Sequence, residues 1–491
     1  MSVRSGICVL LVSLPALAGD LDPPPGPVQP TMKTLDAVEP RRAIESLLFA
    51  ITEPGSWYLT RGVTLDGPGD ALTIHAPGVV LDLNGFALDG AHLAGRAIAI
   101  TSDGPVTIRN GIIRGFIDGG IHAPAAAQAL IEDLHLVDNG GTGLDIAGGV
   151  VRRCTFEGND VGLTWDDGIV ISACVARRNG TGFQGGSGAA LSHCTAIDNG
   201  LAERTAAPPR GGPAGAGFHL GDDCTLTACV SRGNGSYGIA GGTGVTLQHC
   251  SASGNGAVDA NPGIFLGDAA VVSDTTASNN TGNGIEAENG AVITQCSAVG
   301  NMGEGILTAD ASTIRGCTAR DNSGTGIITG DIALVAECAA FNNGDEGIAI
   351  NASSKAHSCT VQENGRHGIF TSIYCEVRDC NVIRSAQHGI FTQSNCYIFG
   401  NNCQANGTIF VGEGIHLVGS NSRVEGNHCT ANDVGIRVQF AGNYVFRNTC
   451  QGNSVLPESQ YQIDAGNTVG TLIESPTDPA LNAWSNFTDL P

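Results

Sequence analysis

Short apolar runs alternate with Gly-rich polar turns at a regular interval along most of the chain. A glycine followed by an apolar residue recurs every 21 residues, at Gly284, Gly305, Gly326, Gly347, Gly368 and Gly389. The same pair recurs at looser spacing at Gly120, Gly143, Gly162, Gly182, Gly217, Gly238, Gly263, Gly414 and Gly435. A fixed period of this length is typical of a solenoid, in which each repeat is one turn of the chain. The pattern therefore marks fifteen turns.

Each 21-residue unit reads as three short strands. In the unit that begins at Gly305, residues 305–308 and 313–317 alternate apolar and polar positions, and Asn322 precedes a Gly-rich turn. Strands of this length do not form a sheet alone, but stacked coils let each strand pair with its copy about 4.8 Å away. Solenoids of helices need longer units with a period near 3.6. We therefore predict an all-β fold, a single-stranded parallel β-helix of about fifteen or more coils with three parallel sheets.

Cysteine and asparagine follow the same spacing as glycine. Cysteines recur at matching places in ten units, at Cys154, Cys174, Cys194, Cys229, Cys250, Cys296, Cys317, Cys338, Cys359 and Cys380. Asn follows nearly every one of them by five residues, and Ser385 takes its place after Cys380. The side chains of cysteines in one ladder project in the same direction, a geometry that does not suit a disulfide bond. We predict a stack of small buried thiols, with Cys375–Cys396 and Cys224–Cys229 as the pairs best placed to form disulfides.

The two ends of the chain differ from the repeats. Arg4, an apolar run over 7–17 and the sequence Ala16-Leu17-Ala18 are typical of a signal peptide over 1–18, cleaved after Ala18. We therefore expect a secreted, periplasmic or cell-surface protein, and the absence of a later long apolar run predicts no membrane span. The expected domains are a Pro-rich lead-in and N-terminal cap over 19–53, the β-helix over 54–455 and a C-terminal cap over 456–491. Residues 34–50 are expected to form a short amphipathic cap helix.

The repeats resemble those of the right-handed parallel β-helix superfamily, which includes pectate lyases, polygalacturonases, alginate lyases and mannuronan epimerases. The Asn ladder of that superfamily appears here only at Asn401, Asn427 and Asn448, and cysteine replaces it upstream. The segments 31–41, 54–60, 80–86 and 484–487 also resemble a family of exported bacterial β-helix proteins that has no established activity. The resemblance implies a right-handed coil, with substrate lying across the sheet formed by the strand after each Gly-Ile.

The net charge of the chain limits the classes of partner that it can bind. The 491 residues include 47 acidic and 24 basic side chains, a formal net charge of −23. This balance disfavours nucleic acid and anionic membranes. An anionic polysaccharide would need a local basic groove or bridging Ca²⁺. Acids that end strands could bind Ca²⁺ between coils, namely Asp166, Asp167, Asp222, Asp223 and Asp268, although no ligand loop of defined spacing is present. The cysteines of the chain show no Cys-x-x-Cys spacing, and we expect no metal site other than these Ca²⁺ candidates.

Alternation predicts which side chains face outward from the Gly-Ile strands. The outward line is His122, Asp145, Thr164, Gln184, His219, Ala240, Phe265, Glu286, Leu307, Ile328, Ala349, Phe370, Phe391, His416 and Arg437. The residue before each glycine forms a neighbouring line that includes Glu304, Thr325, Glu346, His367, His388 and Glu413. Because equivalent positions stack, side chains of one line are expected to lie beside one another.

Charged and aromatic side chains gather on five successive coils of these lines. They are Asp345, Glu346, Arg366, His367, Phe370, His388, Phe391, Glu413, His416 and Arg437. A lyase or epimerase needs a base for the proton beside a carboxylate, here His367 or His388, and a cation to neutralise that carboxylate, here Arg366 or Arg437. A glycosidase would use two separated carboxyls, here Glu346 and Glu413. Phe370, Phe391, His416 and Arg437 would contact the sugar. A solvated face of mixed charge explains the same residues without any site.

Two further patterns carry less weight. His122, Asp145 and the nearby Asp118 form a small group that is typical of ordinary surface contacts. The sequence Gly221-Asp222-Asp223-Cys224 resembles the acidic motif of polygalacturonases, but it follows its strand instead of lying on it, and the His motif expected one coil later is absent. Inserts before Gly217, Gly263 and Gly414 would wall a groove along the candidate sheet.

Two functions from different classes fit these observations. The first is an exported protein that binds or processes polysaccharide, as a lyase or epimerase of uronic-acid polymers in preference to a hydrolase. The alternative is a non-catalytic surface or matrix protein with a structural or adhesion role. Convergence of His367, His388 and Glu413 on one sugar-sized site would favour the enzyme.

Overall fold

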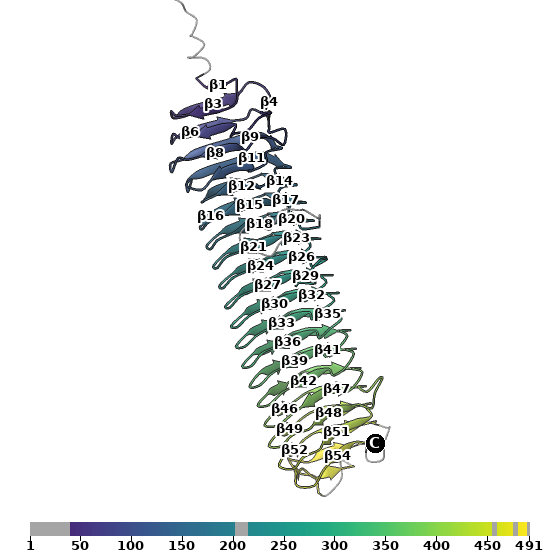
Figure 1. Cartoon of the computed structure of the whole chain (residues 1–491). Helices are drawn as coiled ribbons and strands as arrows, with labels where there is room; N and C mark the ends of the chain where they lie inside the picture. Colours follow the sequence, from purple (N-terminus) through teal and green to yellow (C-terminus); the bar gives the residue numbers. More distant parts are fainter. Residues whose placement is uncertain (1–39, 202–214, 454–458, 475–479, 489–491) are drawn as a thin grey trace, which may run out of the picture. The chain divides into compact units, whose positions relative to one another are not determined.

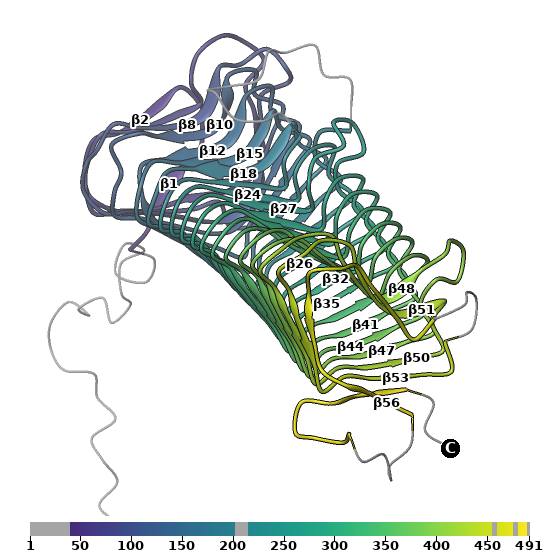
Figure 2. The ribbon, with the colours of Figure 1, turned by 90° about the horizontal axis from the view of Figure 1, so that it is seen from below.

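The computed structural model describes residues 40–201, 215–453, 459–474 and 480–488, and all regular structure in these ranges is β-strand. The chain divides into residues 1–41 and a second unit from Arg42 to Pro491. In the second unit the strands stack in chain order, from β1 (Arg42–Ile44) to β57 (Asn486–Thr488) (Figure 1). Seen from below, successive coils lie over one another (Figure 2). The predicted all-β right-handed parallel β-helix is confirmed.

One ladder of parallel strands carries the predicted outward line, and we call it sheet B. Its nineteen strands are β2 (Phe49–Ile51), β5 (Leu72–Ile74), β8 (Arg96–Ile100), β10 (Gly119–Ala123), β12 (Thr142–Ile146), β15 (Val161–Trp165), β18 (Thr181–Gly185), β21 (Phe218–Leu220), β24 (Ile239–Gly241), β27 (Ile264–Leu266), β30 (Ile285–Ala287), β33 (Ile306–Thr308), β36 (Ile327–Thr329), β39 (Ile348–Ile350), β42 (Ile369–Thr371), β45 (Ile390–Thr392), β48 (Glu413–Leu417), β51 (Val434–Val438) and β54 (Tyr461–Ile463). The fifteen strands from β10 to β51 are those that the Gly pattern marked. The other four, β2, β5, β8 and β54, lack the glycine before their first inward residue.

The other two strands of each coil form two further ladders. They are joined into one sheet, sheet A, because β9 (Val106–Arg114) and β11 (Ala129–Val137) run through both positions without a break. The prediction of three strand ladders therefore holds, although two of them share a sheet near the N-terminal end.

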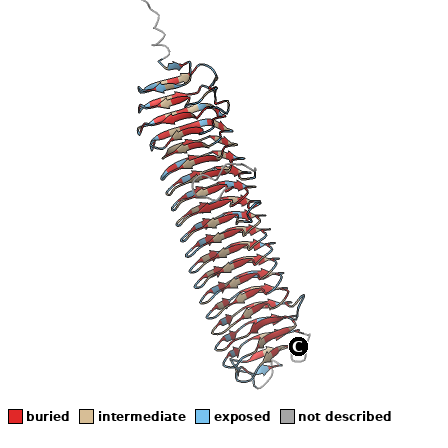
Figure 3. Cartoon of the chain, in the orientation of Figure 1, coloured by how far each residue is buried: buried red, intermediate tan, exposed pale blue. Residues whose placement is uncertain are grey.

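The core is a column of identical apolar positions. The first residue of β30, β33, β36, β39, β42 and β45 is an isoleucine that is fully buried in every case. Figure 3 shows the buried strands in red and the exposed turns in pale blue. Because full burial of one such side chain contributes about 1.5–3 kcal/mol, each added coil contributes stability from its own layer of the column.

The glycine before each isoleucine is required by a close approach. A Cβ at Gly326 would lie 2.6 Å from the Asn343 side-chain nitrogen and 2.6 Å from the Gly347 carbonyl oxygen. The side-chain amide of Asn343 belongs to a buried ladder in which each Asn donates to the next, and Asn322 donates to the Asn343 Oδ1 at 3.0 Å. The glycine and asparagine of the repeat are therefore one structural device.

All sixteen cysteines of the described residues are buried and free, which confirms the predicted stack of thiols. The two proposed disulfides are wrong. Cys375 donates its thiol to the Asn351 carbonyl at 3.0 Å, and Cys396 donates to the Ser372 carbonyl at 3.2 Å. Stacked side chains project in parallel, so each sulfur finds a backbone oxygen of the preceding coil in place of a second sulfur.

The chain ends correct one prediction. Of the expected cap helix over 34–50, residues 34–39 lie outside the described part, as do the signal peptide and most of the lead-in. Over the rest, β1 and β2 replace the helix: Arg42 pairs with Trp57 and Ile44 with Leu59 of β3 (Gly55–Leu59). Ile44 and Ile51 are buried, so these residues already form the first coil of the core. At the other end β57 pairs with β53 (Thr449–Gln451). None of the described residues forms a helix long and apolar enough to cross a membrane.

Candidate functional site

The structure brings together the charged and aromatic residues that the sequence placed on neighbouring coils. Backbone N–H groups of Gly326, Gly347, Gly368 and Gly389 donate to the carbonyls of Glu346, His367, His388 and Glu413, so those four residues occupy successive coils. Register pairing stacks Phe370 on Phe391, His416 and Arg437 in turn. We call this group the downstream cluster, defined as Glu346, Arg366, His367, Phe370, His388, Phe391, Glu413, His416 and Arg437.

Four rings of the cluster stack at close to the spacing of the coils. The His367 and His388 rings lie 4.9 Å apart at an interplanar angle of 10°. The Phe370 and Phe391 rings lie 5.7 Å apart at 6°, and His367 also stacks on Phe391 at 4.9 Å. His416 is perpendicular to His388, at 4.6 Å and 88°. Packing against the phenylalanines therefore orients all three imidazoles.

Both arginines of the cluster are bound to carboxylates. Arg366 Nη1 lies 2.9 Å from Glu346 Oε1, and Thr325 donates its hydroxyl to Glu346 Oε2 at 3.1 Å. Arg437 Nη1 lies 3.4 Å from Glu413 Oε1. The arginine side chains are 50% and 39% exposed, whereas Glu413 is 2% exposed. A ligand at this surface would meet guanidinium groups and phenylalanine rings first.

Burial and neighbouring charge shift the pKa values of the buried acids and imidazoles. Burial, helped by the charges of His388 and Arg366, lowers the pKa of His367 to about 3. Burial also lowers the pKa of His416 to about 4, against the opposing effect of Glu413. For Glu413 burial acts to raise the pKa, but the contact with His388 and the charges of His416 and Arg437 outweigh it and lower the pKa. Burial and the charge of Asp345 raise the pKa of Glu346. Near neutral pH, His367 and His416 are therefore uncharged.

His388, Glu413 and His416, all predicted members of this cluster, also form a group that the sequence did not predict as a metal site. One ligand atom from each lies within 4.8 Å of the other two, close enough for a metal ion. The sequence carries only a weak signal for it, a Glu and a His three residues apart on β48 and a His on the preceding coil. His367, by contrast, is 4% exposed and stacks beneath His388, so it does not reach the surface.

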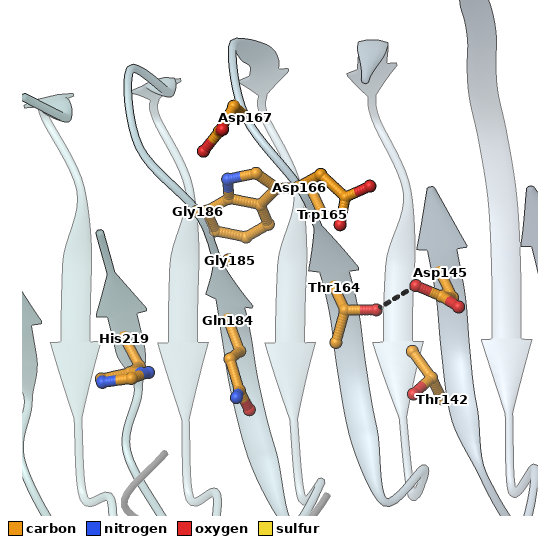
Figure 4. Close-up of a pocket in the computed structure, with 10 residues that line it drawn as sticks. All are labelled: Thr142, Asp145, Thr164, Trp165, Asp166, Asp167, Gln184, Gly185, Gly186 and His219. Carbon is orange, nitrogen blue, oxygen red and sulfur yellow. Dashed lines mark hydrogen bonds between the residues drawn. The ribbon is translucent and has the colours of Figure 1, made fainter. Parts of the chain in front are cut away.

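A pocket of about 590 Å³ opens on sheet B further upstream, and we call it the upstream pocket. It crosses β12, β15, β18 and β21, and its lining is Thr142, Asp145, Thr164, Trp165, Asp166, Asp167, Gln184, Gly185, Gly186 and His219 (Figure 4). Asp145 anchors it: its carboxylate accepts from the Thr164 hydroxyl at 2.8 Å and contacts His122 Nδ1 at 2.8 Å.

Trp165 reaches the pocket because the next coil has no side chain in its way. A Cβ at Gly185 would fall on the indole ring, so the ring lies over that glycine (Figure 4). The Trp165 Nε1 and the His219 Nδ1 are buried and have no hydrogen-bond partner. Burial lowers the pKa of His219, so its ring is neutral. The lining carries three carboxylates and no lysine or arginine, which makes the pocket acidic.

Three of the five acids that were considered as Ca²⁺ ligands form hydrogen bonds between coils. Asp167 accepts from the Ser187 N–H at 2.6 Å, Asp222 from the Thr243 N–H at 2.8 Å and Asp268 from the Asn289 N–H at 3.0 Å. Each carboxylate therefore holds the turn of the following coil. The Gly221-Asp222-Asp223-Cys224 sequence serves this turn, as its register predicted.

Comparison with known proteins identifies the repeat. A family model described as a right-handed β-helix region matches residues 96–251, 214–313, 243–373 and 307–403. No curated protein matches the sequence of this chain.

Solved structures with the same kind of fold include three that are similar over most of this chain. The A-module of mannuronan C-5 epimerase AlgE4 from Azotobacter vinelandii is 13% identical, with 85% of this chain and 91% of that chain covered and a TM-score of 0.29. The periplasmic alginate epimerase AlgG is 11% identical, with 75% and 77% covered and a TM-score of 0.36. The Dettilon tailspike protein is 12% identical, with 78% and 62% covered and a TM-score of 0.30. At these identities the likeness concerns the fold alone.

Proposed function

Since this chain belongs to the family of right-handed β-helix proteins, we propose that the outer face of its sheet B binds polysaccharide, with the upstream pocket as the main subsite. The observation that carries the proposal is the pocket itself, a hollow of about 590 Å³ lined by Trp165, by three carboxylates and by an amide. Sites of this size combine a few oriented polar groups with apolar surface. Because residues 1–18 are expected to be a signal peptide, the glycan of this proposal is one met outside the cytoplasm.

The pocket chemistry favours a neutral glycan. Asp145, Asp166 and Asp167 offer acceptors for sugar hydroxyls, and Trp165 Nε1 offers an unpaired donor. A polyanion would be repelled by three carboxylates with no basic side chain among them, unless Ca²⁺ bridged the charges. Sugar hydroxyls, which both donate and accept, suit this lining without a counter-ion.

The downstream cluster favours a second activity on the same face, the processing of uronic-acid polymers. The specific observation is that Arg366 and Arg437 are partly exposed on either side of His388. In a lyase or epimerase, His388 would take the proton beside the uronate carboxylate while an arginine neutralises that carboxylate. Phe370 and Phe391 would contact the sugar face, and His367 would position His388 by stacking.

Hydrolysis by the two glutamates of the cluster fits the geometry poorly. Glu346 and Glu413 lie three coils apart, which is about 14 Å along the stack. The carboxyl groups of inverting glycosidases lie about 6.5–9.5 Å apart, and those of retaining ones are closer. Elimination or epimerisation therefore remains the better proposal for this cluster.

The proposal is tested by glycan binding to the mature protein. Neutral, pectic, alginate and glycosaminoglycan polymers are presented with and without Ca²⁺, and binding is compared for wild type, Trp165→Ala and Asp145→Asn. Trp165→Ala should weaken binding about thirtyfold, the effect of losing a buried aromatic anchor of about 2 kcal/mol. Glu286→Gln, on the same outward line but outside the pocket, should bind like wild type.

Ultraviolet absorbance of unsaturated sugar products, and the ratio of epimers, tests the second activity with His388→Ala as the negative variant. Binding without any product would assign the protein to the adhesion or matrix class. Absence of binding to every polymer, or equal binding by Trp165→Ala and wild type, would overturn the main proposal.

A further inference from the structure

Three electron-pair donors of the downstream cluster meet at one buried point. The His416 Nδ1 lies 3.2 Å from His388 Nε2 and 3.5 Å from Glu413 Oε2, and His388 Nδ1 is in direct contact with that same oxygen. The side chains of Glu413, His416 and His388 are 2%, 10% and 14% exposed. Water therefore has little access to the point where they meet.

The hydrogens available at this point do not satisfy the three groups. His388 Nδ1 accepts from the Glu413 backbone N–H at 3.2 Å and also contacts Glu413 Oε2. His388 Nε2 and His416 Nδ1 lie 3.2 Å apart, with one hydrogen between them. When His388 Nδ1 accepts in this way, Glu413 Oε2 receives no hydrogen bond, and His416 Nε2 has no hydrogen-bond partner either. Leaving a buried carboxylate oxygen without a partner is unfavourable, and a cation would remove that cost.

We propose that His388, Glu413 and His416 bind one divalent transition-metal ion of the zinc class. In a tetrahedral site with metal–ligand bonds of about 2.0–2.1 Å, the ligand atoms are about 3.4 Å apart. The His416 Nδ1 separations, 3.2 Å from His388 Nε2 and 3.5 Å from Glu413 Oε2, are close to that value, and all three ligand atoms lie within 4.8 Å of one another. Two imidazole nitrogens and one carboxylate oxygen suit zinc, cobalt or nickel, whereas Ca²⁺ and Mg²⁺ prefer oxygen ligands alone.

The surroundings of the three residues fit such a centre. Arg437 engages Glu413 Oε1 and leaves Oε2 for the metal, the role of an outer partner that orients a ligating carboxylate. Phe391 packs against both imidazoles, at 5.7 Å from His388 and 5.4 Å from His416. Three protein ligands leave a fourth position free, as in catalytic zinc sites. The positive charge of Arg437 opposes the cation, but its contact is with the oxygen that points away from it.

The inference does not rest on glycan binding at the upstream pocket. It does exclude a free-base role for His388 while the ion is bound, because the ligating electron pair is then occupied. Product formation from uronic-acid polymers, measured in chelator and in zinc, therefore separates the two roles of this residue.

The test is metal binding by the intact mature protein after chelator treatment. Zn²⁺ is titrated calorimetrically, and Co²⁺ is followed by its visible absorption. One ion per chain is expected, with the intense visible bands of tetrahedral Co²⁺. Glu413→Gln and His416→Ala should each weaken binding about a hundredfold or more, since removing even an outer partner of a ligand costs tenfold to a hundredfold.

The controls separate this site from the other donors of the chain. His122→Ala removes a second His–carboxylate pair, and Glu346→Gln removes the other buried acid of the cluster; both should bind like wild type. Circular dichroism checks that the ligand variants fold. A stoichiometry well below one, unchanged affinity in Glu413→Gln, or the thiolate charge-transfer band expected from the buried cysteines would each overturn the proposal.

Discussion

The buried asparagine ladder offers the sharpest test of the energetics, and we expect Asn322→Ala to open the chain locally. Asn322 makes four side-chain hydrogen bonds. It donates to the Ala298 carbonyl at 3.1 Å and to Asn343 Oδ1 at 3.0 Å, and its own oxygen accepts from the backbone N–H of Asn301 at 3.0 Å and from the Asn301 amide at 2.9 Å.

The expected loss of stability depends on which hydrogen bonds the partners of Asn322 keep in the variant. The Asn301 amide keeps its bond to the Ala277 carbonyl, and Asn343 Oδ1 keeps the backbone N–H of Asn322. The backbone N–H of Asn301 loses its acceptor while buried, which costs about 1–3 kcal/mol, and the other lost bonds add about 1 kcal/mol. The free energy of local opening should therefore fall by about 2–4 kcal/mol.

Native-state hydrogen exchange measures this opening in the affected coils. A loss of about 3 kcal/mol corresponds to roughly hundredfold faster exchange of the Asn301 amide and its neighbours. Asn289→Ala is the matched control, because Asn289 also bonds from coil to coil, to Asp268 Oδ1 at 3.0 Å, but is exposed to water. If both variants exchange alike, or if exchange at Asn301 is unchanged, the reasoning that burial gives the ladder its value is refuted.

Two further predictions concern the stability of single coils. Ser385→Asn should slow hydrogen exchange of the Asn364 amide about tenfold, a gain in stability of about 1.4 kcal/mol. The new side chain would complete the asparagine ladder next to Asn406, and Gly368 leaves room for it. Unchanged exchange would show that the serine already satisfies the gap in the ladder. For Glu157, burial acts to raise the pKa, but hydrogen bonds and charge from Arg177 and Arg178 outweigh it and lower the pKa from 4.5. Its contribution to stability is therefore present above about pH 4.5 and is lost as the pH falls through the lowered pKa, so the difference in thermal midpoint between wild type and Glu157→Gln should be largest at neutral pH and disappear in acid.

The repeat made most of the fold predictable, and its interruptions made the rest difficult. In fifteen strands of sheet B a glycine that the sequence displays precedes the first inward residue, whereas Ala71 precedes it at β5 and Ala97 within β8, so the pattern did not predict these two strands. The expected helix over 34–50 failed in its described part because apolar spacing in a short segment does not distinguish a helix from a strand that stacks on a coil. The strand conformation of Ile44 is set by its pairing with Leu59 of the next coil and not by the sequence of its own segment.

The candidate site divides in the same way. The outward line from His122 to Arg437 was predictable because it needs only alternation and register, and the observed pairing of Phe370, Phe391 and His416 confirms it there. The convergence of His388 with Glu413 depends on rotamers set by packing against Phe391. The upstream pocket depends on Gly185, whose missing side chain lets an indole from an inward position cover the next coil. No periodic pattern contains that information.

The 21-residue spacing of the central coils sets the distance between the two sites in whole coils. Coils from Gly284 to Gly389 are equal in length, and each of those that begin at Gly284, Gly305 and Gly326 adds one strand spacing of about 4.8 Å between the upstream pocket and the downstream cluster. Deleting residues 306–326 would join Gly305 to Ile327 and bring the two sites closer by one strand spacing. The distance between the sites is thus quantised, and a chain of this design can match the repeat length of a bound polymer by gaining or losing whole coils.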